Sequence, residues 1–313
     1  VYFKGLIQNW FSFTDQAVND DSAYGFTNRR LRFIPYGTFG KNIKWGIHFF
    51  ADKGNSFNFL DAFIDYKFSK QFSLKIGKFA APGAISGALT SSGALDLIER
   101  APISMVWGGG SALHGYRAYG VQAHGNLLEG KLYYAVMLAN PKTTTYFTPS
   151  IKATSFKNDE KGITIWSRLE AKPMKGLRLG GFFSSGTATD SEDNETKRSS
   201  YGAHLFYKSN GFNFKMEYIA GENGGIDYDG MYVVLGYKLG KKFEPVVRYD
   251  FVTPKDGGEK FTNFSLGINY FASKNIKYQA NYIIRNEEMV DVVNNIFYIN
   301  FQYSFNSKSK KKK

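Results

Sequence analysis

Hydrophobic and polar residues alternate with a period of two along most of the chain. In residues 263–270, for example, Phe264, Leu266, Ile268 and Tyr270 fall on one face and polar residues on the other. The same alternation recurs in residues 162–172, 211–220 and 297–305. Such alternation, with β-branched and aromatic residues on the apolar face, predicts β-strands. Helical spacing is almost absent, and we expect one short helix, over residues 92–99.

The connections between the predicted strands are of two kinds, which alternate along the chain. Tight turns, usually containing Lys, lie at residues 39–42, 68–71, 127–131, 172–176, 208–211, 239–242 and 272–275. Longer polar loops lie at residues 14–23, 52–58, 81–114, 141–160, 186–198, 222–228, 253–260 and 286–292. Seven turns and eight loops imply sixteen strands with both termini at the turn end. The strands are long enough for a tilted membrane crossing, which takes roughly 9–11 residues.

Three all-β architectures compete for this pattern. A soluble sandwich would have strands of roughly 5–6 residues, and a propeller would show four-strand repeats, which we do not find. A transmembrane antiparallel β-barrel explains the strand length, the aromatic residues and the two kinds of connection. We therefore predict one barrel of about sixteen strands over residues 1–305, with short periplasmic turns and long extracellular loops. We expect residues 306–313 to be a Lys-rich tail without regular structure.

Composition changes the picture in three ways. The 313 residues include no Cys, which excludes disulfides, thiolate metal sites and a Cys nucleophile. No apolar run is long enough for a helical membrane span. The net charge of +13 includes five lysines in the tail, and the other cations interleave with acids, so we expect no nucleic-acid surface. The chain begins at Val1, and we expect a secretory signal to have been removed.

Two segments carry a family resemblance. The run FIDYKFSKQFSLKIGKFAAP (63–82), followed by SSGALDLIERAP (91–102), resembles the porin O/P family (phosphate-selective porin O and P-like) of bacterial outer-membrane β-barrel porins. The Arg-rich run TNRRLRF (27–33) is also similar, and the aromatic end at 297–305 resembles the signal read by barrel assembly machinery. The resemblance implies a trimer of sixteen-stranded barrels with an inward-folded third loop. It also implies passive diffusion of small polar solutes, with anion or phosphate selectivity in some members.

The third loop, residues 81–114, is the expected constriction. Its candidate residues are Asp96, Glu99, Arg100 and Trp107. In phosphate-selective relatives the constriction includes a Lys and an arginine ladder, but this loop contains no Lys. We therefore expect no high-affinity phosphate selectivity. The apolar residues from Ile103 to Trp107 are expected to anchor the loop against the barrel wall, because buried aromatic residues usually pack.

Alternation also predicts which charged residues face the lumen. The predicted pore-lining cations are Arg30, Arg32, Lys44, Lys67, Lys75, Arg168, Arg178, Lys215, Arg248, Lys277 and Arg285. Six acids share these faces: Asp61, Asp65, Glu170, Glu217, Glu244 and Asp250. A net positive wall would favour anions. The alternative is a cross-strand network of ion pairs with little selectivity, and acidic extracellular loops would oppose the approach of anions.

Enzymatic alternatives have little support. The four His residues show no metal-ligand spacing. A hydrolase built on Ser184 and His204 would need a third, orienting group. We expect no catalytic residue, no metal and no cofactor. The sequence thus predicts an outer-membrane diffusion channel for small polar or ionic solutes, with a weak anion preference. Its expected partners are outer-membrane lipid, small solutes or ions, copies of itself in a homotrimer, and envelope proteins. The alternative is a structural barrel subunit or an anchor for a partner complex.

Overall fold

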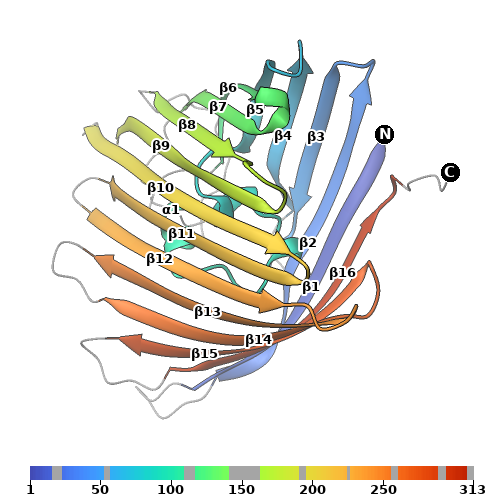
Figure 1. Ribbon diagram of the computed structural model, residues 1–313, viewed down its shortest axis with the longest axis vertical. Coiled ribbons are helices and arrows are strands. Elements are labelled where there is room, and N and C mark those ends of the chain that lie inside the picture. The colour runs from blue at the N-terminus through green and yellow to red at the C-terminus, as the bar shows by residue number, and fades with distance from the viewer. Residues whose placement is uncertain are drawn as a thin grey trace.

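The protein is a closed barrel of sixteen antiparallel strands (Figure 1). The computed structural model describes residues 1–15, 23–52, 57–108, 117–140, 163–189, 195–223, 226–254, 260–287 and 294–308. Each strand pairs with its neighbours in sequence, and β1 pairs with β16 to close the ring. The first and last strands therefore lie side by side (Figure 1).

The strands are β1 (Tyr2–Thr14), β2 (Ala23–Phe39), β3 (Ile43–Phe50), β4 (Asn58–Lys67), β5 (Ser73–Ala80), β6 (Arg117–Leu127), β7 (Leu132–Ala139), β8 (Thr164–Ala171), β9 (Leu177–Thr189), β10 (Glu195–Ser209), β11 (Phe212–Asn223), β12 (Ile226–Tyr237), β13 (Phe243–Pro254), β14 (Phe261–Phe271), β15 (Ile276–Glu287) and β16 (Ile296–Asn306). The helical segments are η2 (Ile85–Leu89), η3 (Ser92–Ala94), α1 (Pro102–Gly108) and η4 (Leu128–Gly130). Among the described residues, no helix is long and apolar enough to cross a membrane.

The strand count and all seven short turns predicted from the sequence are confirmed. Two of the predicted loops, 186–198 and 222–228, are too long. The ladder of β9 and β10 continues to the pair Thr189 and Glu195, and that of β11 and β12 to the pair Asn223 and Ile226. Backbone pairing does not require an apolar face, so a hairpin of polar residues can extend into water beyond the membrane.

The barrel is apolar outside and polar inside. Leu169 is 53% exposed, whereas its neighbours Arg168 and Glu170 are 6% and 4% exposed. Leu266 and Ile268 on β14 likewise point outward, between the buried Ser265 and Asn269. A soluble protein shows the opposite arrangement, so the exposed apolar faces match a lipid environment.

The C-terminus follows the ladder slightly beyond the predicted barrel domain. Asn306 pairs with Lys4, and the Ser307 N–H donates to the Phe3 carbonyl at 2.8 Å. Residues 309–313 of the predicted tail lie outside the described residues.

The outward face of β14 provides a test of membrane placement. Leu266 lies mid-strand, so L266R should destabilise the folded protein by about 2–4 kcal/mol, the cost of Arg near the bilayer midplane. Leu239, which is 53% exposed at the turn between β12 and β13, is the matched control. L239R should cost no more than about 1 kcal/mol, because the penalty falls near the interface. Urea unfolding in lipid vesicles measures both, and equal losses would contradict the predicted depth.

Candidate functional site

The loop after β5 crosses the inside of the barrel. Its described part, residues 81–108, is called the inner loop here. From β8, Arg168 donates to the Gly83 carbonyl at 2.9 Å. From β16, Gln302 donates to the Gly93 carbonyl at 3.1 Å, and from β1, Gln8 donates to the Ser92 carbonyl at 3.3 Å. Because β8 lies opposite β1 and β16 in the ring, these contacts place the inner loop within the lumen, as predicted.

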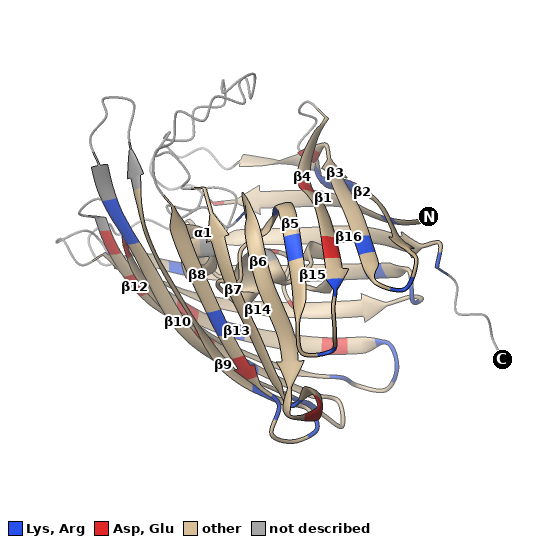
Figure 2. Cartoon of the chain, turned by 90° about the horizontal axis from the view of Figure 1, so that it is seen from above, with Lys and Arg blue, Asp and Glu red and all other residues tan. Residues whose placement is uncertain are grey.

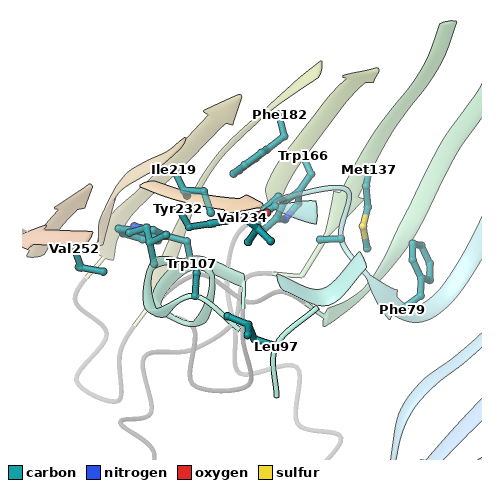
Figure 3. Packing of buried hydrophobic residues seen from close by; sticks show 14 of the residues in the cluster. Phe79, Leu97, Trp107, Met137, Trp166, Phe182, Ile219, Tyr232, Val234 and Val252 are labelled. Carbon is teal, nitrogen blue, oxygen red and sulfur yellow. The ribbon is translucent and has the colours of Figure 1, made fainter. Parts of the chain in front are cut away.

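An apolar patch on the inner wall holds one side of the loop (Figure 3). Ile103 and Trp107 of α1 are buried, which confirms the predicted anchor. Their neighbours in the cluster include Met137, Trp166, Phe182, Ile219, Tyr232, Val234, Val246 and Val252 of the wall. The Trp107 Nε1–H donates to the Tyr228 carbonyl at 3.2 Å. At Gly230 a Cβ atom would lie 2.3 Å from the Phe251 carbonyl oxygen and 3.0 Å from Ile103, so glycine lets both the neighbouring strand and the helix approach.

A buried carboxylate provides the second anchor. Glu217 on β11 is 1% exposed. It accepts hydrogen bonds from the backbone N–H groups of Ile85 and Ser86, at 2.6 and 3.1 Å. The hydroxyls of Ser86 and Tyr232 also donate to it, at 2.5 and 3.1 Å. The Ser86 and Ser104 hydroxyls are hydrogen-bonded to each other, which ties α1 to the same carboxylate.

The short helix predicted at residues 92–99 is wrong. Only Ser92–Ala94 forms a helical turn, Leu95 is extended, and the α-helix lies at Pro102–Gly108. The wall explains why, because its side chains bind the carbonyls that a helix would use. Gln302 donates to the Gly93 carbonyl at 3.1 Å, and Lys277 donates to the Leu95 carbonyl at 3.0 Å.

Three charged residues of the inner loop have different partners. Asp96 accepts from Lys215 at 2.6 Å and from Asn213 at 2.8 Å, which fixes the loop to β11. Arg100 turns back onto its own loop and donates to the carbonyls of Ser86, Gly87 and Thr90. Glu99 faces the opposite wall and pairs with two consecutive arginines of β2.

A β-bulge brings those two arginines together. Gln8 pairs with Arg30 and Asn9 pairs with Asn28, so Arg29 is an extra residue in β2. Arg29 donates to Glu99 Oε1 at 3.0 Å and Arg30 to Glu99 Oε2 at 3.3 Å. Both guanidinium groups lie over the Trp10 ring, at 5.1 and 5.3 Å from its centroid. Strict alternation predicted an inward Arg30 but missed Arg29, because a bulge leaves no mark in the periodicity.

These arginines set the protonation of Glu99. Burial alone would raise the pKa of this loop carboxyl, but the charges of Arg30 and Arg29 outweigh burial and hold its pKa below the ordinary value. Glu99 is therefore an anion at neutral pH and remains one in mildly acidic solution.

Open space remains between the inner loop and the wall formed by β1 to β4. A cavity of about 590 Å³ is lined by the cations Lys4, Arg29, Arg30, Arg32, Arg100 and Arg117. It shares Lys4 and His48 with a second cavity of about 450 Å³, which shares Lys44 and Asp65 with a third of about 520 Å³ at the short turns. These shared residues place the three cavities in a row, called the passage here.

Nine of the eleven predicted pore-lining cations fall into two groups. Arg30, Arg32, Lys44, Lys67 and Lys75 line the passage. In contrast, Arg168, Lys215, Arg248 and Lys277 donate to the inner loop and hold it in place. Arg178 binds Glu170 at 2.7 Å, and Arg285 donates its backbone N–H to Asn295. Trp107 is an anchor and does not line the passage.

Comparison with known proteins now identifies the family. The profile of the family phosphate-selective porin O and P matches residues 7–305. The chain belongs to this family. The protein is thus an outer-membrane porin, a barrel through which solutes diffuse passively. No curated protein matches the sequence of this porin.

Solved structures share the fold of the porin at low sequence identity. An anion-selective porin from Comamonas acidovorans matches with a TM-score of 0.73 and 15% identity, covering 97% of this chain and 99% of that one. OmpF of Salmonella typhi in complex with daunomycin matches with a TM-score of 0.70 and 14% identity, covering 97% of each chain. The trimer form of OmpT from Vibrio cholerae matches with a TM-score of 0.66 and 15% identity, covering 97% of this chain and 99% of that one.

The residues considered for a hydrolase lie apart in the porin. Ser184 pairs with Ser200, and their hydroxyls lie 2.7 Å apart. His204 pairs with Gly180, four residues along the ladder, which corresponds to about 13 Å. Its Nε2 atom lies 3.5 Å from a carboxylate oxygen of Glu170. The two side chains therefore form no nucleophile–base pair in this structure.

Removing the buried carboxylate should loosen the inner loop. In E217A, two backbone N–H groups and two hydroxyls lose their acceptor, and each unsatisfied donor costs about 1–3 kcal/mol. We expect a lower thermal midpoint and a larger, more variable single-channel conductance in planar bilayers. E222A is the control, because Glu222 is exposed on the same strand. Unchanged conductance in E217A would rule out this anchor.

The depressed pKa of Glu99 predicts a pH window. A lowered pKa means that the ion pairs contribute fully above the ordinary glutamate value of 4.5 and are lost as the pH falls through the lower, folded value. The difference in anion preference between the wild type and E99Q should therefore be constant from neutral pH down to this value and should disappear below it, as Arg29 and Arg30 lose their counter-charge in the wild type. E99Q should show the stronger preference at neutral pH. Reversal potentials measure both, with E222Q, at an exposed position that does not line the passage, as the control.

Proposed function

We propose that the passage makes this porin a channel that prefers small anions. The main observation behind this proposal is the charge along the passage. Eleven cationic side chains line the three cavities, whereas only four acidic side chains do so. Asp61 and Asp52 are themselves paired with arginines, Asp61 with Arg117 at 2.7 Å and Asp52 with Arg32 at 2.5 Å. A narrow, low-dielectric tube with an excess of one sign concentrates the opposite ion. The fold similarity to an anion-selective porin adds support.

The proposed preference is for anions in general and not for phosphate in particular. Side chains of the barrel wall and backbone contacts already occupy much of the hydrogen-bonding capacity of the inner loop. Residues 81–108 of this loop include no Lys. The arginines nearest the loop are shared with Glu99. A permeating anion therefore meets cations whose charge is partly compensated, which favours passage over tight retention.

The single experiment is a reversal-potential measurement in planar bilayers across a KCl gradient. We expect a shift in the anion-selective direction. Lys44 and Lys75 line the passage and have no ion-pair partner among the described residues. K44Q/K75Q should therefore reduce the shift without breaking an ion pair, whereas K241Q at an exposed turn should leave it unchanged. A cation-directed shift in the wild type would overturn the proposal, and strong block of chloride current by millimolar phosphate would contradict general anion passage.

We also propose that the porin is a homotrimer. The similarity to a trimer form of OmpT from Vibrio cholerae supports this assembly. Native mass spectrometry of the detergent-solubilised protein should give three times the chain mass of 35.3 kDa. A monomer under the same conditions would contradict it. The proposed activity is diffusion without covalent chemistry, and the alternative of a partner-anchoring barrel predicts no ohmic conductance.

A further inference from the structure

Exposed lysines surround the turn end of the barrel. Each of the seven short turns, all of them described, has at least one exposed lysine in it or directly beside it (Figure 2). Lys67 is one of these lysines but lines the passage. The other ten, called the lysine collar here, are Lys41, Lys70, Lys131, Lys172, Lys175, Lys208, Lys238, Lys241, Lys242 and Lys274. The same turns contain a single acid, Glu129. The collar is therefore a strongly positive ring at the periplasmic rim.

Large apolar side chains accompany the collar. Phe39, Phe68, Leu128, Met174 and Leu239 are 75%, 59%, 69%, 58% and 53% exposed, and each lies in or beside a different turn. These side chains have no core to enter at the end of a hairpin. An exposed apolar group beside a cation is the arrangement that suits the boundary between acyl chains and headgroups.

One lysine of the collar, Lys242, is directed toward the outer surface of the barrel. Its Nζ atom lies 5.9 Å from the ring centroid of Tyr270, which packs on Phe243 at 4.9 Å. Phe243 is 46% exposed on the lipid-facing side of β13. This contact holds an ammonium group at the edge of the apolar belt, where lipid headgroups lie.

Internal ion pairing does not account for the collar. Within the described residues, Lys172 is the one member with a carboxylate partner, at 3.7 Å from Glu170. Hydrophilic turns as such would accept Asp, Glu, Ser or Asn equally well, yet lysine recurs in all seven. The collar therefore presents a ring of cations to a partner that carries negative charge.

We propose that the lysine collar binds the phosphate headgroups of anionic phospholipids in the periplasmic leaflet, while the neighbouring apolar side chains pack among the acyl chains. Ammonium and phosphate form charge-assisted hydrogen bonds, and basic residues at a membrane surface attract anionic lipid. The inference rests on the placement of the barrel in the outer membrane and not on its conduction or its selectivity.

Native mass spectrometry of the whole protein, released from nanodiscs that contain equal amounts of phosphatidylglycerol and phosphatidylcholine, tests the proposal. The wild type should retain phosphatidylglycerol in preference. In K175Q/K238Q/K241Q/K242Q/K274Q this enrichment should fall at least about fivefold, the effect of losing one lysine at an anionic surface. The same five positions changed to Arg should keep the enrichment. K197Q, an exposed position near the opposite end of β10, should also keep it.

Three other outcomes would contradict the proposed binding of anionic phospholipid by the lysine collar. Equal retention of both lipids by the wild type, or full enrichment in the five-lysine variant, would overturn the proposal. Displacement of phosphatidylglycerol by millimolar inorganic phosphate would assign the collar to free anions instead. If the five-lysine variant does not fold, K241Q/K242Q is measured for a smaller decrease. Bilayer conductance on the same samples separates the two proposals, because the five-lysine variant should conduct like the wild type.

Discussion

Closure of the hydrogen-bonded ring is the constraint on which the structure depends. In hydrocarbon a backbone N–H or C=O without a partner costs several kcal/mol, so a spanning sheet must have no free edge. Pairing of β1 with β16 over eleven residue pairs, from Lys4 with Asn306 to Thr14 with Ile296, removes that edge. Once the ring is closed, alternate side chains face lipid and lumen, and the exposed Leu169 beside the buried Arg168 and Glu170 follows directly.

The same constraint acts on the inner loop, which lies away from bulk water inside the barrel. Its carbonyls need donors, and the wall supplies them from Arg168, Arg248 and Lys277. Its N–H groups at residues 85 and 86 need an acceptor, and Glu217 supplies it. Many charged residues of the wall are therefore part of the loop's backbone hydrogen bonding, and counting wall charges by alternation alone overstates how many of them meet a solute.

The barrel was predictable because its signals are local and repeated: a period of two, lysine-containing turns and long polar loops. On β8 the predicted alternation agrees with the burial of Arg168 and Glu170 on either side of the exposed Leu169. Alternation missed Arg29 at the bulge of β2, where the register shifts. A bulge depends on the fit between two strands, so one strand's sequence does not reveal it. The helix predicted at 92–99 does not form for a related reason, since side chains of distant strands bind the carbonyls of Gly93 and Leu95.

One signal of the site is present in the sequence as a break in the alternation. Strict alternation is broken by consecutive apolar residues at Phe182–Phe183 and Val233–Val234, where one member of each pair must face the lumen. Phe182 and Val234 belong to the cluster that seats α1. The positions that break the alternation thus mark the part of the barrel wall on which the inner loop packs.

The position of the inner loop determines which charges of the wall a solute can meet. Because the apolar patch draws the inner loop onto the strands from β7 to β13, the space left for solutes lies along β1 to β4. That side carries Arg30, Arg32, Lys44 and Lys75, with the bulge adding Arg29. Moving the patch to another sector of the ring would open a passage beside other residues, even with every wall charge unchanged. The apolar residues that seat the inner loop therefore determine which charged residues line the passage.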